Sequence, residues 1–268
     1  MTAGPTTPFT AVVLAGKRPG KDPVAEAAGV ACKSFAPIDG RPMVHRVLDA
    51  LAAARQVGQR ILCGPSQSII SQEPELYDRL KTGEAKWIDS HSTPSLSTYR
   101  ALQAFPDSKP VLVTTADHAL LTPQIVDYFC DEARRLPCDV AAGLTAYDGV
   151  MAAFPETRRT AIKFKDGAYS GCNLFGFLNP RSDRAAQFWR QIEQERKKPL
   201  RMMRILGWWT IVRYLLGRIT LDKGLEKLSN KMQINLRAVL LPFPQAAIDV
   251  DTVDDWHFVQ NLAKKQVI

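Results

Sequence analysis

The sequence of 268 residues predicts an α/β fold: a single Rossmann-like, three-layer domain with a mainly parallel mixed sheet and a helical insert. Two apolar runs, FTAVVLA at 9–15 and VLVTT at 111–115, are rich in β-branched residues and typical of buried strands. Over the first 145 residues, such strands alternate with helical patterns. This alternation is typical of βαβ units, which build parallel sheets.

Shorter patterns predict the remaining elements. The Asp166-Gly167 turn divides 161–177 into two expected strands. Other short apolar runs predict strands at 60–63, 85–88, 140–144, 239–241 and 247–250. Apolar residues at helical spacing predict helices at 42–55, 76–81, 95–105, 182–197, within 201–230 and at 252–264, and Thr122-Pro123 opens one more. The segment 17–39 is rich in Gly, Pro and charge and predicts a loop.

Composition excludes several classes of protein. With 46% hydrophobic and 23% charged residues, the chain differs from disordered sequences. Its five cysteines are widely spaced and include no C-x-x-C pair, which is more typical of reduced thiols than of disulfides or a zinc site. Residues 1–10 lack the basic start and apolar core of a secretory signal. We therefore expect a cytoplasmic protein with one domain over 1–268.

The net charge of +8 is concentrated in one segment. Residues 196–237 hold 11 Lys and Arg against 2 acidic residues, whereas the rest of the chain holds 24 basic and 25 acidic residues. Nucleic-acid-binding proteins usually spread their positive charge over a whole domain surface. We therefore expect no nucleic-acid partner and interpret 196–237 as a basic, apolar helical insert.

Within this insert, the stretch RMMRILGWWTIVRYLLG at 201–217 combines aromatic, aliphatic and arginine side chains. Its longest uncharged run, at 205–212, is far shorter than the roughly 20 residues that a membrane-spanning helix needs. Two interpretations stay open. The stretch packs on the protein core or on a second copy, or it lies peripherally on the inner membrane surface, where Trp and Arg suit anionic headgroups.

The loop after the first strand offers groups that suit phosphate. Gly16 permits close approach of backbone to a ligand, and Lys17, Arg18 and Lys33 supply cations. The loop matches neither the P-loop pattern nor G-x-G-x-x-G. From spacing alone, a plain charged surface loop is the favoured explanation of these residues.

Carboxylates follow a second buried strand and the last apolar run. Asp117 stands directly after the strand at 111–115, where an α/β protein can hold Mg²⁺. Asp249 and Asp251 follow the last apolar run, and one carboxylate from each cluster plus substrate phosphates would suffice for the ion. For Asp251, capping of the closing helix is the alternative explanation.

Three stretches, in this order, resemble the MobA-like nucleotidyltransferases, whose fold is of the glycosyltransferase-A type. The first joins LAG at 14–16 to KSFAPIDGRPM at 33–43, similar to the family's LAG…K-x-[FL]-x-P-[IV]-x-G-[RK]-P-M. The second, VLVTTAD at 111–117, is similar to the strand that ends in the family's metal-binding Asp. The third, IDVDTVDD at 248–255, resembles D-x-D-T-x-x-D-[LW]. Together they frame 9–262, nearly the whole chain.

The resemblance implies a reaction and its cofactor. A nucleoside triphosphate (NTP) and a phosphorylated acceptor give a nucleotide-linked product and pyrophosphate, with Mg²⁺ bound. Sugar phosphates, cofactor precursors and lipid headgroup precursors all fit the acceptor. The resemblance implies catalytic roles for Lys33 and Arg18, nucleotide binding by Leu14, Ala15, Gly16, Lys17, Ser95 and Ser97, metal binding by Asp117 and Asp251, and acceptor binding by Asn173. Such transfer depends on positioning and cations and needs no nucleophilic side chain.

One alternative function keeps the same fold. A catalytically inactive relative would bind nucleotide as a sensor, or act as a membrane-peripheral partner protein through 201–217. Joint retention of Lys33, Asp117 and Asp251 favours the enzyme, because an inactive protein has no chemical need for all three. A glycosyltransferase of this fold usually carries D-x-D after a central strand, whereas this chain has Asp117-His118-Ala119.

Overall fold

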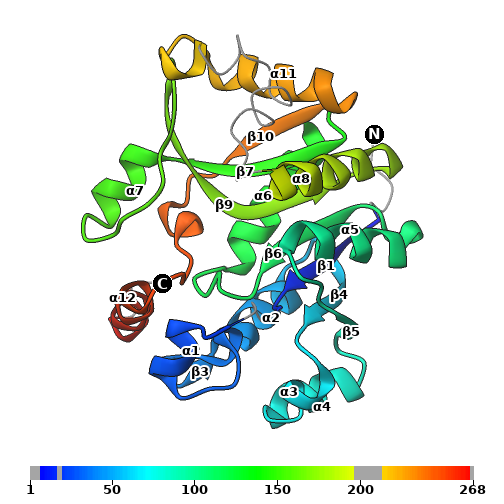
Figure 1. Cartoon of the computed structure of the whole chain (residues 1–268), viewed down its shortest axis with the longest axis vertical. Coiled ribbons are helices and arrows are strands. Elements are labelled where there is room, and N and C mark those ends of the chain that lie inside the picture. The colour runs from blue at the N-terminus through cyan, green and yellow to red at the C-terminus, as the bar shows by residue number, and fades with distance from the viewer. Residues whose placement is uncertain (1–6, 17–19, 196–212, 266–268) are drawn as a thin grey trace.

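The computed structural model describes residues 7–16, 20–195 and 213–265, and Figure 1 shows their arrangement. In this part of the chain, eight strands form one sheet, and β2 (Pro37–Ile38) pairs with β3 (Arg41–Pro42) in a small second one. The large sheet consists of β1 (Phe9–Leu14), β4 (Val57–Gly64), β5 (Lys86–Asp89), β6 (Val111–Thr115), β7 (Val140–Ala146), β8 (Ile162–Phe164), β9 (Gly167–Phe177) and β10 (Leu236–Leu240).

The strand order is β10-β7-β9-β6-β1-β4-β5, with β8 paired to β9. Strand β9 runs antiparallel to β6 and β7, whereas β1 pairs in parallel with β4 and β6, β4 with β5, and β10 with β7. The predicted mainly parallel mixed sheet is confirmed. From β1 the chain first builds β4 and β5 on one side and then returns to β6 on the other. Such a reversal is where α/β sheets bind ligands.

Helices cover both faces of this sheet. One core includes side chains of α2, α6 and α12, and the other includes side chains of α5, α8 and α11. Strand β1 serves both, because Ala11 and Val13 face the first core and Val12 the second. The helices are α1 (Pro23–Ala28), α2 (Met43–Ala53), α3 (Gln67–Ile70), α4 (Pro74–Lys81), α5 (Pro94–Ala104), α6 (Pro123–Arg135), α7 (Tyr147–Ala153), α8 (Asp183–Glu195), α11 (Leu221–Met232) and α12 (Val253–Lys264).

Threonine caps fix where several of these helices begin, among them α5 and α6. The Thr122 hydroxyl accepts a hydrogen bond from Ile125 N at 3.3 Å, directly before α6, as the Thr122-Pro123 pair predicts. The Thr93 hydroxyl accepts one from Leu96 N at 3.3 Å and starts α5. The second cap matters for function, because it places the beginning of α5 beside the loop that follows β1.

Two expectations about local structure are wrong. Residues 247–250 form no strand; Pro244–Ala247 is a 3₁₀ helix, and Ile248 and Val250 are buried in the core without pairing in the sheet. The segment 17–39 is more than a loop, since it contains α1 and the 3₁₀ helix η1 (Lys33–Phe35). Asp22 caps α1 by accepting hydrogen bonds from two backbone N–H groups, and this short helix was hidden by the surrounding Gly and charge.

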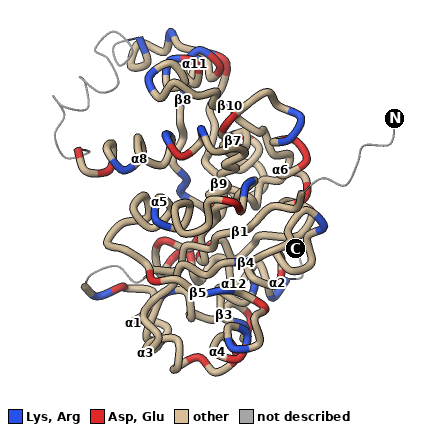
Figure 2. Tube along the Cα trace, turned by 90° about the vertical axis from the view of Figure 1, so that its right-hand side faces the viewer, with Lys and Arg blue, Asp and Glu red and all other residues tan. Residues whose placement is uncertain are grey.

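Much of the basic insert lies outside the described residues. Of 196–237, the structure describes 213–237, which contains α11 and the start of β10. Three lysines and two acidic residues lie along α11 (Figure 2). Of the stretch 201–217, only 213–217 is described; there Leu215 and Leu216 are exposed and the Tyr214 ring contacts Phe164. None of the helices in the described part of the chain is long and apolar enough to cross a membrane.

Candidate active site

The loops that follow β1, β4 and β6 meet at one edge of the sheet. The last residues of these strands are in register, with Leu14 opposite both Cys63 and Thr115. Backbone hydrogen bonds continue past the strands, from Ala15 N to Cys63 O at 2.8 Å and from Ala116 N to Leu14 O at 3.0 Å. The carboxyl ends of three parallel strands therefore hold the loops that the sequence singles out.

A cavity of about 270 Å³ opens between these loops. Its walls come from the loop after β1, from residues within 20–34 that include α1, from the turn before α5, and from the end of β6. The residues of the sequence prediction that line it are Leu14, Ala15, Gly16, Lys33, Ser97 and Asp117. The predicted phosphate contacts Lys17 and Arg18 lie outside the described residues.

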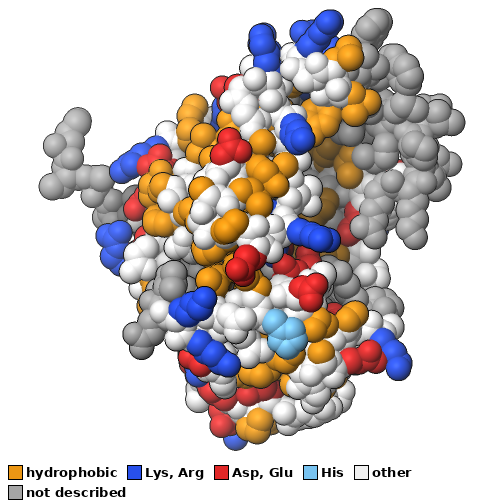
Figure 3. Space-filling model, turned by 90° about the vertical axis from the view of Figure 1, so that its left-hand side faces the viewer, with side chains coloured by type: hydrophobic (Ala, Val, Ile, Leu, Met, Phe, Trp, Pro, Cys, Tyr) orange, Lys and Arg blue, Asp and Glu red, His pale blue; other side chains and the backbone are white. Residues whose placement is uncertain are grey.

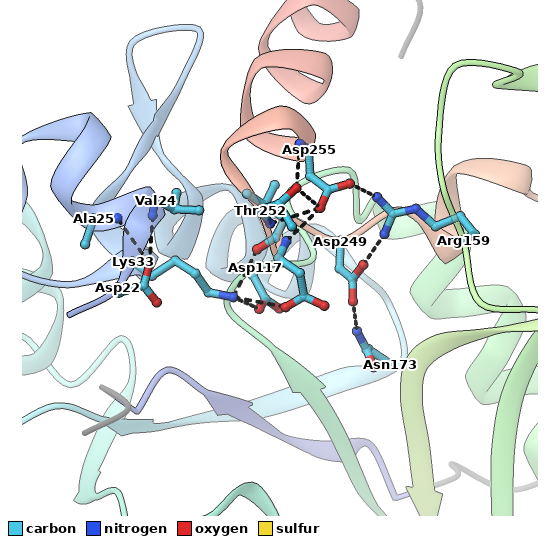
Figure 4. A network of polar contacts seen from close by, with 12 residues as sticks. Asp22, Val24, Ala25, Lys33, Asp117, Arg159, Asn173, Asp249, Thr252 and Asp255 are labelled. Carbon is cyan, nitrogen blue, oxygen red and sulfur yellow. Dashed lines mark hydrogen bonds and ion pairs between the residues drawn. The ribbon is translucent and has the colours of Figure 1, made fainter. Parts of the chain in front are cut away.

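Lys33 connects the three stretches of the sequence motif. Its ammonium lies 2.5 Å from Asp117 Oδ2, 3.0 Å from the carbonyl oxygen of Val250 and 3.4 Å from Asp251 Oδ1 (Figure 4). The side chains of Lys33 and Asp117 are mostly buried, at 16% and 14% exposed, whereas Asp251 is 53% exposed. One cation thus contacts two carboxylates that lie far apart in the sequence.

Asp117 is held in its charged form. Burial favours the neutral acid, but the positive charge and hydrogen bond of Lys33 outweigh this effect and keep the pKa of Asp117 below its ordinary value. Its second oxygen, Oδ1, is buried and has no hydrogen-bond partner among the described residues. The hydrogen bond from Lys33 therefore satisfies one carboxylate oxygen of Asp117 and leaves the other without a partner among the described residues.

The start of α12 fixes the segment that carries Asp251. Thr252 and Asp255 form a capping box, in which the Thr252 hydroxyl accepts from Asp255 N at 3.1 Å and Asp255 Oδ2 accepts from Thr252 N at 2.9 Å. Asp255 Oδ2 also accepts from the backbone N–H of Asp251, at 3.3 Å. Asp251 is therefore positioned by the cap while its own carboxylate faces Lys33.

Arg159, which no sequence motif singles out, contacts this acidic segment at two carboxylates. One guanidinium nitrogen contacts Asp249 and another contacts Asp255, and the arginine side chain is only 8% exposed (Figure 4). Burial and the nearby carboxylates of Asp117 and Asp251 raise the pKa of Asp249 to about 6, and Arg159 opposes this shift. The arginine lies 90 positions before Asp249, in a stretch without a motif, so no signal in a single sequence pointed to it.

Asn173, the predicted acceptor-binding residue, lies on β9 near the same segment. Its backbone is in the left-handed region, with φ of 48°, which asparagine tolerates better than most residues. Its side-chain Nδ2 donates to Asp249 Oδ2 at 2.8 Å. The amide therefore contacts the acidic segment from the side opposite Lys33, and its amide nitrogen is engaged within the protein.

The two serines predicted to bind nucleotide have different surroundings. Ser97 lines the cavity, and its hydroxyl accepts a hydrogen bond from His91 N at 2.8 Å, which closes the turn before α5. Ser95 is fully buried, and its hydroxyl contacts Glu193 of α8 instead. Ser97 is thus placed to shape the cavity wall, whereas Ser95 joins two helices.

His118 directly follows Asp117 but does not line the cavity. Only 1% of the residue is exposed, and burial lowers its pKa to about 4 despite the nearby charge of Asp117. The imidazole is therefore neutral near pH 7 and belongs to the protein interior.

On one side of the cavity, most of the charged side chains are acidic. Acidic side chains gather in a hollow on the face of the molecule that Figure 3 shows. Beside the cavity, Lys33 pairs with Asp117 and Asp251, and Arg159 pairs with Asp249 and Asp255. The described residues include no group of three or more His, Cys, Asp or Glu at metal-binding distance. A metal ion here would therefore need ligands from a substrate in addition to protein carboxylates.

Comparisons with known structures agree with this architecture. A hypothetical transferase structure from Thermus thermophilus is 28% identical over 93% of this chain and 99% of its own, with a TM-score of 0.77. A CMP:2-keto-3-deoxy-manno-octonic acid synthetase complexed with CTP is 14% identical and shares the fold over 96% of this chain and 99% of its own, with a TM-score of 0.57. The 4-diphosphocytidyl-2C-methyl-D-erythritol synthase of Anaerococcus prevotii DSM 20548 is 13% identical, with a TM-score of 0.57 over 96% of this chain and 97% of its own.

No curated protein sequence matches the chain significantly. The model of the MobA-like NTP transferase domain, however, matches residues 11–204. That range contains most of β1, the loop after it, Lys33, the cavity-lining turn before α5 and Asp117. The chain belongs to the MobA-like NTP transferase family, a family of nucleotidyltransferases.

Proposed function

We propose that the protein is a Mg²⁺-dependent nucleotidyltransferase that joins the nucleoside monophosphate of an NTP to a phosphorylated acceptor and releases pyrophosphate. The observation that carries this proposal is the contact of Lys33 with both Asp117 and Asp251 at the wall of the cavity. A charge arrangement of this kind suits phosphate groups together with a divalent cation, because two carboxylates and substrate phosphates are the ligands that Mg²⁺ usually takes.

Each group then has a proposed role; for Lys17 and Arg18, which lie outside the described residues, it rests on the sequence alone. The loop after β1, with Gly16, Lys17 and Arg18, receives the triphosphate, and Lys33 stabilises the charge that grows at the α-phosphate. Asp117 and Asp251 would hold Mg²⁺, and the ion would neutralise phosphate charge. An acceptor phosphate oxygen forms the new bond to the α-phosphorus while the bond to the pyrophosphate breaks. A phosphate acceptor is already ionised at neutral pH and requires no general base.

The decisive experiment measures pyrophosphate release with Mg²⁺ and each of CTP, GTP, ATP and UTP. The acceptors are phosphorylated sugars, polyols, cofactor precursors and lipid headgroup precursors. We expect release with one nucleotide and one acceptor, and a loss of at least about 100-fold in Lys33→Ala and Asp117→Ala. Wild-type rates in either variant would refute the assignment. Nucleotide binding without release from any pair would favour the inactive nucleotide sensor.

A matched control comes from a second buried ion pair. Lys109 lies 2.6 Å from Asp183 and is 9% exposed, but it precedes β6 and so lies at the opposite edge of the sheet from Lys33. Lys109→Ala therefore removes an equally buried lysine without touching the cavity. It should lower stability while the folded enzyme retains its rate.

We also propose that the stretch 201–217 contacts an anionic membrane surface, where a lipid headgroup precursor would be delivered. The exposure of Leu215 and Leu216 favours a surface role for the described end of the stretch over packing in the core. Sedimentation with vesicles of anionic phospholipid tests this proposal. Binding that is lost in Leu215→Ser/Leu216→Ser supports membrane contact, and equal binding of neutral and anionic vesicles contradicts it.

A further inference from the structure

The position of the Lys33 ammonium coincides with the place that a divalent cation needs. Nζ lies between Asp117 Oδ2 and Asp251 Oδ1, the two carboxylates proposed as metal ligands, and also donates a hydrogen bond to the carbonyl oxygen of Val250. All three are oxygen atoms, the kind of ligand that Mg²⁺ and Mn²⁺ take. The ammonium of Lys33 therefore occupies the position that a divalent cation bound to these three oxygens would take.

The structure leaves an incoming ion no separate approach to Asp117. Oδ1 is buried without surface open to solvent. The oxygen that an ion would meet is therefore Oδ2, which Lys33 contacts at 2.5 Å. A metal–oxygen bond is about 2.0–2.1 Å long, so an ion on Oδ2 and an ammonium on the same oxygen would lie within close repulsive distance.

We propose that Lys33 and the divalent cation compete for Asp117 and Asp251, and that the nucleotide resolves the competition by drawing Lys33 onto its phosphates. Metal and nucleotide then bind with positive coupling, each raising the affinity for the other by the same factor. Without nucleotide, Lys33 stays paired with Asp117 and Asp251, and free metal ions are excluded from these carboxylates. This inference rests on the proposed function, because it takes the phosphates of an NTP as the group that receives Lys33.

The proposal predicts that the loss of a catalytic cation raises the affinity for metal. A variant that loses a catalytic cation should bind metal more tightly than the wild type when nucleotide is absent. Lys33→Met keeps an unbranched apolar chain and removes the charge, so the two carboxylates become available. Lys33→Arg keeps the charge and should keep the exclusion of metal.

The experiment titrates nucleotide-free protein with Mn²⁺ alone and follows the free ion by electron paramagnetic resonance. We expect Lys33→Met to bind one Mn²⁺ about tenfold or more tightly than the wild type, as expected when a competing charge leaves a partly buried site. Equal or weaker binding by Lys33→Met would overturn the proposal. So would a gain of the same size in Lys33→Arg.

Two controls establish where the gained ion binds. Lys21 lines the same cavity but pairs with Glu26 at 3.3 Å, so Lys21→Met changes the local charge without freeing Asp117 or Asp251. It should leave Mn²⁺ affinity unchanged. The double variant Lys33→Met/Asp251→Asn should lose the gain; retention of the gain would place the ion elsewhere and contradict the proposal.

A second measurement covers the case in which Lys33→Met folds poorly because Asp117 loses its partner. The unfolding temperature is then measured with and without Mn²⁺. We expect a larger Mn²⁺-dependent rise in Lys33→Met than in wild type, since the ion replaces the lost charge. An equal rise in both proteins counts against competition.

The Mn²⁺ titration and the pyrophosphate assay test the two proposals separately, because either result can be negative while the other is positive. Pyrophosphate release by the wild type together with unchanged Mn²⁺ binding in Lys33→Met would defeat this inference and leave the enzyme assignment standing. Tighter Mn²⁺ binding without pyrophosphate release from any NTP would do the reverse: the competition would be established and the assignment would fail.

Discussion

Gly16 faces Ser90 so closely that no side chain fits between them. A Cβ added to Gly16 would lie 2.8 Å from Ser90 Cβ and 2.9 Å from Ser90 Oγ. Ser90 is itself anchored by its backbone N–H, which donates to Gly64 O at 2.9 Å. The requirement for glycine in the LAG motif is therefore steric here: it lets the loop after β1 pack against the end of β5 at the cavity wall.

Gly16→Ala should weaken NTP binding, because Ser90 and the turn after it must move away from the cavity. We expect a loss of about tenfold in affinity, the scale of a small displacement at a positioned site. Ser90→Gly removes both atoms that the new methyl group would meet. The double variant Gly16→Ala/Ser90→Gly should therefore recover most of the affinity, as measured by calorimetric titration with each NTP.

The single variant Ser90→Gly is the matched control and should bind nucleotide nearly as the wild type does. Wild-type affinity in Gly16→Ala would show that the contact is not needed. Failure of the second substitution to restore binding would show that the cause is not the clash with Ser90.

Much of the fold followed from local patterns. Strands β1 and β6 were predicted from continuous apolar runs, which occur because both faces of these strands are buried in the two cores of the sheet. Helix α6 was predicted because Thr122 and Pro123 are strong signals for the start of a helix. The predicted strand at 247–250 failed because burial and strand pairing leave the same apolar signal: Ile248 and Val250 are buried, yet the chain there runs outside the sheet. Tertiary context, which a local pattern cannot contain, decided that case.

The residues of the candidate site were likewise predicted only in part. Lys33, Asp117 and Asp251 were predicted from stretches that share an order with a known family, and the structure brings all three together. Ser95 was predicted from the same family resemblance, yet its hydroxyl contacts Glu193, a partner 98 positions away. Arg159 was not predicted, because its role depends on the packing of its loop against the start of α12 and not on any local sequence.

The two serines give a paired test of the cavity wall. Ser97→Ala leaves His91 N without the acceptor that now lies 2.8 Å away and loosens the turn at the cavity. We expect about a fivefold weaker affinity for NTP, the scale of one lost hydrogen bond. Ser95→Ala breaks the contact with Glu193 and should lower the unfolding temperature while nucleotide affinity is unchanged. A larger loss of affinity in Ser95→Ala than in Ser97→Ala would contradict this assignment of the cavity wall.

Arg159 should act as a positioning residue for the segment with Asp251. Arg159→Ala leaves the carboxylates of Asp249 and Asp255 without their shared cation, so we expect a loss of about 3 kcal/mol in the free energy of unfolding. Arg159→Lys should recover only part of this loss, because one ammonium cannot reach both carboxylates as two guanidinium nitrogens do. Urea unfolding measures both variants.

The neighbouring Arg158 supplies the control, since it is exposed. Arg158→Ala should leave stability within about 0.5 kcal/mol of the wild type. A functional readout separates positioning from plain stability: at a temperature where Arg159→Lys is fully folded, its kcat should still be lower than that of Arg158→Ala. Equal values would assign Arg159 a purely structural role.

Asp139 should make the fold sensitive to acid at the end of the sheet away from the cavity. Its carboxylate accepts from Asn235 N at 2.7 Å and from Asn179 Nδ2 at 2.8 Å. Burial favours the neutral acid, but these hydrogen bonds outweigh it and hold the pKa of Asp139 below its ordinary value of 3.8. A lowered pKa means that the ionised group stabilises the fold above pH 3.8, and that this contribution disappears as pH falls through the folded-state pKa.

The variant Asp139→Asn keeps one acceptor oxygen and turns a donor toward the second N–H group. At pH 7 we expect it to be about 1–3 kcal/mol less stable than the wild type in urea unfolding. The difference should narrow below pH 3.8, because protonation removes the same charge from the wild type. Asp78→Asn, at an exposed carboxylate, should match the wild type at every pH. A difference between wild type and Asp139→Asn that stays constant down to pH 2.5 would show that shape, and not the charge of Asp139, is what the fold requires there.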